Sequence, residues 1–425
     1  MFAVRIPRMS FEALWDLVVS SSREALSVIR GYTHITPLSY SAFLSRMTGS
    51  RVYLKYENLQ KTGSFKVRGA LYKIYTLRGK VKGVVTASAG NHAQGVAYAA
   101  TTFNMKSVVV MPETASISKV EATQGYGAEV LLYGKVYDEA YAKALEIAKE
   151  RGYEFVHAFD DPHIIAGQAT MAWELLEQLN DFDVILVPVG GGGLVAGIAS
   201  VLRKIKPNVK IIGVEPEAAP KMKESLKAGK PVTIEPKPTI ADGLVTRRPG
   251  DVTFELTSNL VDDIVTVGEE DISRAIYILL ERKKTLVEGA GAVGIALLLS
   301  GELKLEGKKV VVPLSGGNID LTILNRIILR GLANSGKLAR ITGYIPDYPG
   351  QLKRTLEVIA RYRGNIIDIL HDRSDPQIPA WHAKVTIVFE TPNIDATKRI
   401  IEELEKEGFK FYTTIGCYGS EVFRK

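Results

Sequence analysis

The chain has 425 residues, of which 46% are hydrophobic and 24% are charged, and these proportions exclude a wholly disordered chain, a collagen and a small disulfide-rich scaffold. The length allows about two to four domains, and the single cysteine, Cys417, excludes an intramolecular disulfide and a cysteine-based metal cluster. The 54 Lys and Arg residues outnumber the 47 Asp and Glu residues, so the formal net charge of +7 raises nucleic-acid binding as a possible function.

The N-terminus does not have the pattern of a signal peptide. Residues 1–16 carry two acids and lack an unbroken apolar run, so we expect a cytoplasmic protein. Residues 184–202 are uncharged and long enough to suggest a membrane span. Pro188 and four consecutive glycines interrupt them, however, and each glycine costs a helix about 1 kcal/mol relative to alanine. We therefore predict two short buried elements joined by a turn, and no membrane partner.

The first 335 residues alternate short β-branched runs with helical stretches. Strands are expected at residues 81–88, 106–111, 128–133, 183–189, 209–216 and 308–317. These runs are nearly continuous in Val, Ile and Leu, as buried parallel strands are. Strands that alternate with helices predict an α/β fold with mostly parallel sheets and helices on both faces. Ligands bind such sheets at the carboxyl ends of the strands.

The last 88 residues, 338–425, have a different pattern. Strand, helix, strand, strand, helix and strand follow one another, which is the β-α-β-β-α-β order of a ferredoxin-like domain. The first helix has apolar residues at helical spacing, and we expect Gly364 to be its C-cap. The sequence thus predicts a large domain over residues 1–335, with a smaller lobe at roughly 55–155, and a separate domain at 338–425.

Lys66 lies in the segment TGSFKVRGA, between an aromatic residue and a Gly- and Ala-containing helix start. A lysine becomes a Schiff-base nucleophile when loss of water lowers its pKa, although most lysines are solvated surface residues. Phe65, next to it, is placed to cover an aromatic cofactor ring.

Three Gly- or Ser-rich turns follow expected strands: residues 88–91, 190–193 and 315–318. The four glycines precede a helix, where backbone N–H groups and partial positive charge bind phosphate, although a glycine run can also be a simple tight turn. The segment lacks the pattern of a P-loop and of a sharp dinucleotide fingerprint. Backbone N–H groups of residues 88–92 suit a carboxylate, His92 alone reads as structural, and Ser315 either binds a ring nitrogen or caps a helix.

The motifs SFKVRGA, SAGNHAQGVA, VGGGGLVAGI, VEGAGAVG and LSGGN occur in that order. Together they resemble the β-family, or fold type II, of pyridoxal-phosphate enzymes over roughly residues 30–335, and more closely the threonine ammonia-lyases. The tail resembles an ACT domain, a regulatory module that binds amino acids, and its YPGQL segment (348–352) is similar to the ligand loop of that module.

The resemblance implies a role for each matched residue. Lys66 forms the covalent link to pyridoxal 5'-phosphate and later moves protons at the substrate Cα. Asn91 meets the ring hydroxyl, Ser315 the pyridine nitrogen, and Glu288 lies near the ring. The cofactor phosphate is held by Gly190, Gly191, Gly192, Gly193 and Leu194. The substrate carboxylate is held by Ser88, Ala89, Gly90, Asn91 and His92.

These residue types favour elimination. Pyridoxal phosphate acts as an electron sink, and a serine at the pyridine nitrogen leaves that nitrogen largely unprotonated, which favours loss of a β-leaving group over transamination. We therefore expect dehydration and deamination of L-threonine to 2-oxobutanoate and ammonia, and also of L-serine to pyruvate. Alternatives are a serine-specific dehydratase, a β-replacing enzyme, an inactive amino-acid sensor and a nicotinamide-dependent oxidoreductase.

Two residues differ from the pattern of some relatives, and these differences narrow the expected reaction and cofactors. Serine racemases of this fold carry a serine where this chain has Ala89, which cannot take a proton, so we expect poor racemisation. Some relatives bind a divalent cation through an acid pair, but here Glu215 is followed by Lys221 at the second acid position. We therefore expect no divalent metal.

A separate module with a ligand-type loop predicts allosteric control by an amino acid bound at 346–352. We also expect a homodimer or homotetramer, because ACT-type tails often pair across subunits. The basic excess is scattered over short patches without interleaved aromatic residues, so we expect no nucleic-acid partner.

Overall fold

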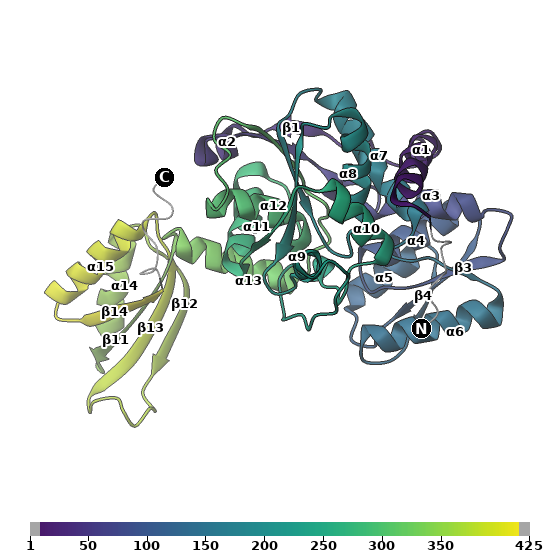
Figure 1. Ribbon diagram of the computed structural model, residues 1–425. Coiled ribbons are helices and arrows are strands. Elements are labelled where there is room, and N and C mark those ends of the chain that lie inside the picture. The colour runs from purple at the N-terminus through teal and green to yellow at the C-terminus, as the bar shows by residue number, and fades with distance from the viewer. Residues whose placement is uncertain (1–8, 416–425) are drawn as a thin grey trace. The chain divides into compact units, whose positions relative to one another are not determined.

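The structure of the protein, a computed structural model, describes residues 9–415. Cys417 lies outside the described residues. So does the start of the N-terminal segment 1–16, whose composition argues against a signal peptide. The chain divides into two compact units between Ile319 and Asp320 (Figure 1). The sequence predicts the domain boundary at residues 335–338, whereas the structure groups helix α13 (Leu321–Asn334) with the residues that follow it.

The first unit contains a six-stranded sheet with the order β1-β2-β10-β7-β8-β9. Its strands are β1 (Leu38–Tyr40), β2 (Arg51–Lys55), β7 (Val184–Pro188), β8 (Lys210–Pro216), β9 (Asp263–Val267) and β10 (Lys309–Pro313). All neighbours pair in parallel except β1 with β2. Every residue of β7 is buried, as expected for a central parallel strand with helices on both faces.

A second sheet of the same unit has four strands in the order β5-β4-β3-β6, all parallel. Its strands are β3 (Gly83–Ala87), β4 (Lys106–Met111), β5 (Glu129–Leu132) and β6 (Glu154–Phe155). They fall within the residues where the sequence predicts a smaller lobe.

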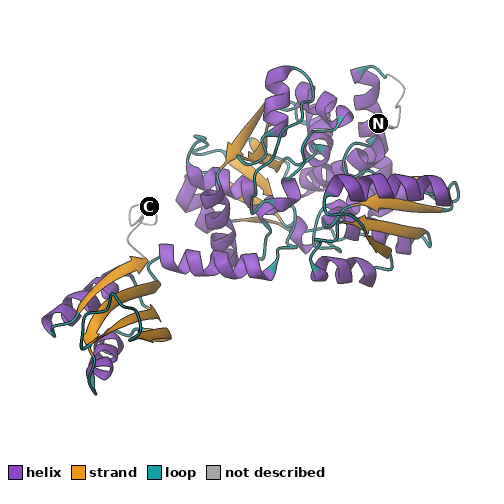
Figure 2. Cartoon of the chain, turned by 90° about the horizontal axis from the view of Figure 1, so that it is seen from below, coloured by secondary structure: helices purple, strands orange, loops and turns teal. Residues whose placement is uncertain are grey.

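Helices surround both sheets (Figures 1 and 2). Those of the first unit are α1 (Phe11–Ile29), α2 (Ala42–Thr48), α3 (Lys66–Leu77), α4 (Asn91–Thr102), α5 (Ile117–Gly125), α6 (Tyr137–Arg151), α7 (Pro162–Gln178), α8 (Gly193–Ile205), α9 (Lys221–Ala228), α10 (Asp251–Leu260), α11 (Glu269–Lys283) and α12 (Gly289–Ser300). In Figure 1, α11 and α12 lie on one side of the six-stranded sheet and α8 and α10 on the other. The predicted α/β fold with mostly parallel sheets is confirmed.

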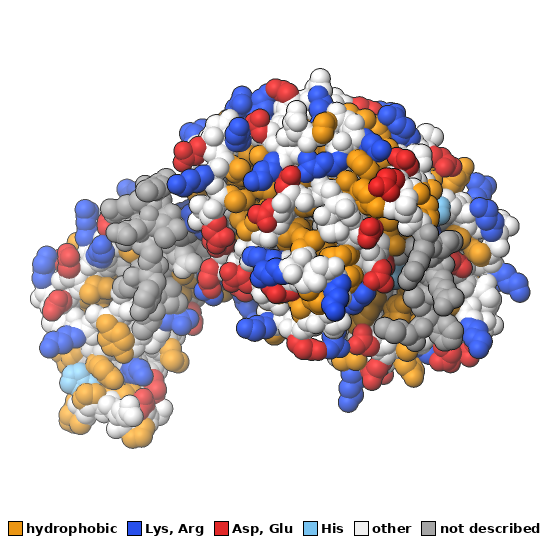
Figure 3. All heavy atoms as spheres, in the orientation of Figure 1, with side chains coloured by type: hydrophobic (Ala, Val, Ile, Leu, Met, Phe, Trp, Pro, Cys, Tyr) orange, Lys and Arg blue, Asp and Glu red, His pale blue; other side chains and the backbone are white. Residues whose placement is uncertain are grey.

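The uncharged segment 184–202 forms β7, a glycine turn and most of α8, as predicted. Within residues 9–415, none of the helices combines the length and the apolar character that a membrane span requires. On the face of the molecule in Figure 3, Lys and Arg side chains are interspersed with Asp and Glu and form no continuous basic stripe.

The second unit has the predicted ferredoxin-like order. After α13 come β11 (Leu338–Pro346), α14 (Gln351–Arg361), β12 (Asn365–Asp372), β13 (His382–Glu390), α15 (Ile394–Lys406) and β14 (Lys410–Ile415). The strands form one antiparallel sheet in the order β12-β13-β11-β14, with both α14 and α15 on one face (Figure 1). Alternate residues of β13 are buried, as expected for a sheet covered on one face.

The expected cap at Gly364 is wrong. The helix α14 ends at Arg361 with Tyr362 as its C-cap, and Arg363, with φ of +63°, adopts the left-handed conformation. Gly364 is needed for space instead, because a Cβ there would lie 2.4 Å from Cγ2 of Ile359. Close packing of the helix end against the sheet therefore explains this glycine.

Candidate active site

Four segments that are distant in sequence meet at the carboxyl ends of strands in the first unit. Ser64 pairs with Gly316 in an isolated antiparallel bridge, and the backbone N–H of Phe65 donates to the carbonyl of Ser315 over 3.0 Å. Asn91 Nδ2 donates to Glu288 Oε1 over 2.7 Å, which joins the start of α4 to the start of α12. The structure thus brings together the segments that carry Lys66, Asn91, Glu288 and Ser315.

Lys66 is the first residue of α3, and its Nζ donates to the carbonyl of Ala158 over 3.0 Å. Burial of the ammonium lowers the pKa of Lys66 to about 8, while the carboxylate of Glu288 opposes that shift. A lysine whose pKa is close to neutral has a substantial fraction of free amine, the form that attacks a carbonyl carbon. Lys66 therefore has the environment of a nucleophilic lysine.

Glu288 is the N-cap residue of α12 and is only 5% exposed. Burial, together with the charge of Asp242, raises the pKa of Glu288 to about 7, although the hydrogen bond from Asn91 favours the ionised form. A carboxyl group with this pKa exchanges its proton near neutral pH. Glu288 is thus a buried carboxyl that both influences Lys66 and fixes the side chain of Asn91.

The glycine turn between β7 and α8 has no room for side chains. Gly192 has φ of +100°, and a Cβ on it would lie 2.8 Å from both Met222 and Thr253. A Cβ on Gly191 would lie 2.2 Å from the ring of Phe159. The first N–H groups of α8 have no partner within the helix and carry partial positive charge. A tight backbone turn at a helix start provides the geometry of a phosphate site.

Three residues that the sequence did not single out support this turn. Thr253 Oγ1 donates to the carbonyl of Gly191 over 2.6 Å, and Phe159 packs on the turn. Asp160 accepts from the backbone N–H groups of residues 251–253 and thereby caps α10. The Asp-Asp-Pro segment indicates a helix cap, but only the structure shows that Asp160 caps a helix 91 residues away.

The loop between β3 and α4 is partly exposed and open above Gly90, where a Cβ would meet no atom within 4 Å. Ser88 Oγ accepts from the N–H of Gly90 over 3.2 Å. The His92 imidazole points inward: its Nε2 lies 3.1 Å from the carbonyl of Val156, and burial lowers its pKa to about 3. His92 is therefore a neutral, buried residue, and only its backbone N–H group is available at the start of α4. Ala89 packs in a small apolar cluster.

Ser315 is 2% exposed, and among residues 9–415 its hydroxyl has no hydrogen-bond partner. The hydroxyl of Ser64, also buried, has none either. Asn318 Nδ2 donates to Asn91 Oδ1 over 2.7 Å and to the carbonyl of Thr62 over 2.9 Å. Ser64 and Asn318 lie within the motifs SFKVRGA and LSGGN, which by themselves predict no role for either residue.

These features fit a phosphorylated aromatic aldehyde. A lysine of lowered pKa can hold the aldehyde, the start of α8 can hold the phosphate, and the unpartnered hydroxyl of Ser315 can meet a ring nitrogen. Pyridoxal phosphate has these three groups, and the residues present therefore suit it.

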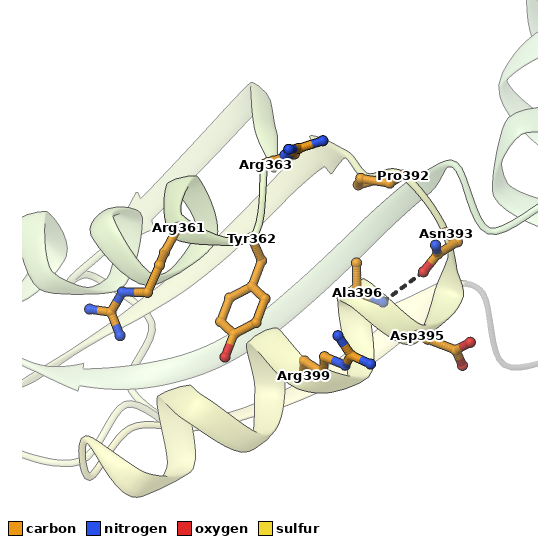
Figure 4. A pocket seen from close by; sticks show the side chains of 8 residues that line it. All are labelled: Arg361, Tyr362, Arg363, Pro392, Asn393, Asp395, Ala396 and Arg399. Carbon is orange, nitrogen blue, oxygen red and sulfur yellow. Dashed lines mark hydrogen bonds between the residues drawn. The ribbon is translucent and has the colours of Figure 1, made fainter.

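The second unit contains a separate open pocket of about 350 Å³ between the end of α14 and the start of α15. It is lined by Arg361, Tyr362, Arg363, Pro392, Asn393, Asp395, Ala396 and Arg399 (Figure 4). Asn393 caps α15 by accepting from the N–H of Ala396 over 2.9 Å. Strand register places this pocket at the opposite end of the sheet from the loop 347–350, because Leu338 pairs with Glu390 and Pro346 with His382.

Comparison with known proteins agrees with the geometry. The family model described as "Pyridoxal-phosphate dependent enzyme" matches residues 29–316. The L-threonine ammonia-lyase of Thermotoga maritima is 46% identical over 92% of this chain and 96% of its own. That of Geobacter sulfurreducens is 46% identical over 91% and 97%. Both alignments extend into the second unit.

Solved structures are similar over most of the chain. The threonine deaminase of tomato, Solanum lycopersicum, in its processed form is 38% identical, with a TM-score of 0.70 over 73% of this chain and 92% of that one. Maize serine racemase is 37% identical, with a TM-score of 0.70 over 72% and 95%. On the match over residues 29–316 and these identities, the chain belongs to the family of pyridoxal-phosphate-dependent enzymes.

Proposed function

We propose that the protein is a threonine ammonia-lyase, which converts L-threonine to 2-oxobutanoate and ammonia and L-serine to pyruvate and ammonia. The observation that carries the proposal is the junction of the Lys66 segment with the Ser315 segment, through the hydrogen bond between Phe65 and Ser315. The 46% identity to L-threonine ammonia-lyases over nearly the whole chain supports it.

Pyridoxal phosphate, when bound, supplies an electron sink for the bonds at the substrate Cα. In the proposal, Lys66 holds the cofactor and then, as an amine with a pKa near 8, takes the proton from Cα. Phe65, Asn91 and Glu288 orient the ring. The phosphate is bound by Gly190, Gly191, Gly192, Gly193 and Leu194.

Ser315 sets the reaction type in this proposal. A hydroxyl at the ring nitrogen supplies no negative charge to hold a proton there, so negative charge at Cα is stabilised less than it would be by a carboxylate. Loss of the β-hydroxyl then competes well with reprotonation, which favours elimination over transamination.

The substrate carboxylate is assigned to the start of α4. The open space above Gly90 and the free N–H groups of the first helical turn suit a carboxylate. Residues in this assignment are Ser88, Ala89, Gly90, Asn91 and His92. Since the Ala89 methyl cannot transfer a proton, we expect elimination to exceed racemisation, although a serine racemase is among the similar structures.

Steady-state kinetics test the proposal. Purified full-length protein with pyridoxal phosphate should form 2-oxobutanoate from L-threonine with a higher kcat/KM than pyruvate from L-serine, and D-serine should form only in traces. One methyl group is worth about 1–3 kcal/mol in a pocket, so a larger kcat/KM for serine would identify the serine-specific alternative. Absence of both oxo acids would contradict the proposal.

We also propose that the enzyme is a cytoplasmic homodimer or homotetramer, and that residues 338–425 form an ACT-type regulatory domain, which binds an amino acid such as isoleucine or valine at its loop 346–352. Its ferredoxin-like order supports this, as does Gly350, whose φ of +95° shapes the loop at the start of α14. The pocket at Arg363 and Arg399 is the competing place for a carboxylate, since neither guanidinium has an ion-pair partner among residues 9–415.

Matched variants separate the two places. Twenty amino acids are screened for a change in threonine kinetics of the full-length enzyme, and light scattering gives the oligomeric state. We expect Gly350→Val to abolish the response and Arg399→Ala to preserve it. The reverse result would move the effector to the arginine pocket, and no response to any amino acid would refute the regulation.

A further inference from the structure

Lys221, the first residue of α9, is a buried cation beneath the glycine turn, and none of its side-chain surface is exposed. Three oxygen atoms surround its Nζ: Glu215 Oε1 at 2.9 Å, the carbonyl of Val189 at 2.8 Å and the carbonyl of Ala219 at 3.3 Å. One carboxylate and two carbonyls are the kind of ligands that hard cations such as Mg²⁺ and Ca²⁺ prefer. The ammonium therefore occupies an oxygen-lined cation site.

The contacts of this ammonium join the parts that shape the turn. Val189 directly precedes Gly190, so the bond from Lys221 holds the backbone at the entry to the turn. Glu215 lies in β8 and accepts from the backbone N–H groups of Met222 and Lys223, each over 3.0 Å. Met222 in turn packs against Gly192. The same set of bonds thus fixes the end of β7, the end of β8 and the start of α9.

Net stabilisation does not explain this arrangement well. Burying an ion pair costs as much in lost hydration as the attraction returns, and an apolar pair of similar size is often as stable. Burial lowers the pKa of Lys221, and the carboxylate of Glu215 opposes that shift. A compact ammonium group with directed N–H bonds holds the oxygen atoms around it in fixed positions. Here those oxygen atoms belong to the segments that shape the proposed phosphate site.

We propose that Lys221 is a positioning residue whose Nζ acts as a tethered cation: it holds the glycine turn in the conformation that binds the cofactor phosphate, and it takes the place of a free metal ion. Truncating Lys221 should open the same three oxygens to an added cation. This inference rests on the proposed cofactor site. Within residues 9–415, no group of three or more His, Cys, Asp and Glu side chains is arranged to hold a metal ion.

The test uses Lys221→Ala in the full-length protein, with Lys223→Ala as the matched control. Lys223 lies on the same helix, but its Nζ contacts Thr266 over 3.3 Å and not the turn. Binding of pyridoxal phosphate to the cofactor-free protein is followed by its visible absorbance, and thermal unfolding is followed in parallel. Both are measured in ammonium, potassium and magnesium chloride, with choline chloride, whose cation is too large for the site, at equal ionic strength.

We expect Lys221→Ala to bind pyridoxal phosphate about 10–100-fold more weakly in choline chloride, as is typical for the loss of a supporting residue around a bound group. At least one small cation should restore most of this affinity and raise the Tm of the cofactor-free variant. Neither wild type nor Lys223→Ala should respond selectively to the cation. Because these readouts need no turnover, they separate this inference from the proposed reaction.

Two results would overturn the inference: unchanged affinity of Lys221→Ala in choline chloride, or a weakened affinity that no small cation restores. If Lys221→Ala does not fold, the double variant Lys221→Met with Glu215→Gln replaces it. The double variant removes both charges, so no buried charge is left without a partner. We expect that double variant to fold and to bind pyridoxal phosphate weakly whatever the cation. Wild-type affinity in the double variant would contradict the tethered-cation role.

Discussion

The two units bury different kinds of side chain. In the first, Arg68 is fully buried between Glu57 and Glu174, at 2.7 Å from each, and Lys55 donates to Glu174 over 2.7 Å. The core of the second unit is a cluster of apolar residues from both helices and the sheet. Its ion pairs lie at the surface, as between Arg361 and Glu403.

This difference between the two cores corresponds to whether the unit must keep a reactive side chain in a fixed position. Arg68 lies two residues after Lys66 on α3, and its bonds fix that helix to Glu57, just beyond β2, and to α7. Buried charges give directed bonds, which hold the Lys66 backbone in one position, whereas apolar packing alone suffices for a domain without such a group. The charged core is thus part of the support of the proposed site.

Replacing Lys66 should have the largest effect. Without the amine that holds the cofactor and moves the Cα proton, we expect Lys66→Ala to lower kcat for threonine by on the order of 10³-fold or more. Product formation by the variant is compared with that of Lys61→Ala, an exposed lysine outside the site. Comparable activity in both variants would remove Lys66 from the mechanism.

Replacing Arg68 should have the next largest effect, on stability. Arg68→Leu leaves Glu57 buried without its ion-pair partner and leaves Glu174 with Lys55 alone, which costs about 3–5 kcal/mol. Arg361→Ala breaks a surface pair in the second unit, worth about 0–1 kcal/mol. Urea unfolding of both variants, with the two transitions followed separately, measures the contrast. Equal losses would mean that the buried charges contribute no more than surface ones.

Two glycines with similar backbone angles give a smaller and more specific contrast. Gly192 has φ of +100° and no room for a Cβ, while Gly350 in the second unit has φ of +95° and open space around it. We expect Gly192→Ala to weaken pyridoxal phosphate binding roughly 10–100-fold, since strain and close contact together cost about 1–3 kcal/mol. Gly350→Ala carries the strain alone and should leave cofactor affinity unchanged. A similar loss in both would indicate strain without a phosphate site.

The smallest expected effect concerns the pH dependence of Glu288. Its folded-state pKa of about 7 exceeds the ordinary value of 4.5, so its contribution to stability is complete below about pH 4.5 and is lost as the pH rises through 7. Glu288→Gln should therefore gain roughly 1–2 kcal/mol over wild type between pH 5 and pH 8. Thermal unfolding of the cofactor-free proteins checks this. An advantage that is the same at both pH values would contradict the raised pKa.

Short sequence patterns predict the elements whose formation depends on residues near in sequence. The Val-rich run predicted as a strand at residues 106–111 matches β4 to the residue. The β-α-β-β-α-β order was sufficient to identify the second unit. Gly364 was misread, because the contact with Ile359 that requires a glycine involves packing that sequence spacing does not reveal.

The site was predictable where short motifs carry it and not where distant segments support it. The motifs identified Lys66, Asn91 and Ser315, which the structure brings together. Nothing in the sequence indicates that Asp160 caps α10 or that Lys221 bonds the carbonyl of Val189. Those contacts join residues 32 to 93 positions apart and depend on how the strands are ordered.

The central claim is that Lys66, and not another buried lysine, holds the cofactor. Sodium borohydride reduction of the protein with pyridoxal phosphate fixes the cofactor on the lysine that binds it, and peptide mass spectrometry then locates that lysine. The account predicts modification of Lys66, with Lys55 and Lys221 unmodified, because each of those two is bonded to a buried glutamate. Modification of Lys55 or Lys221, or of no lysine at all, would contradict it.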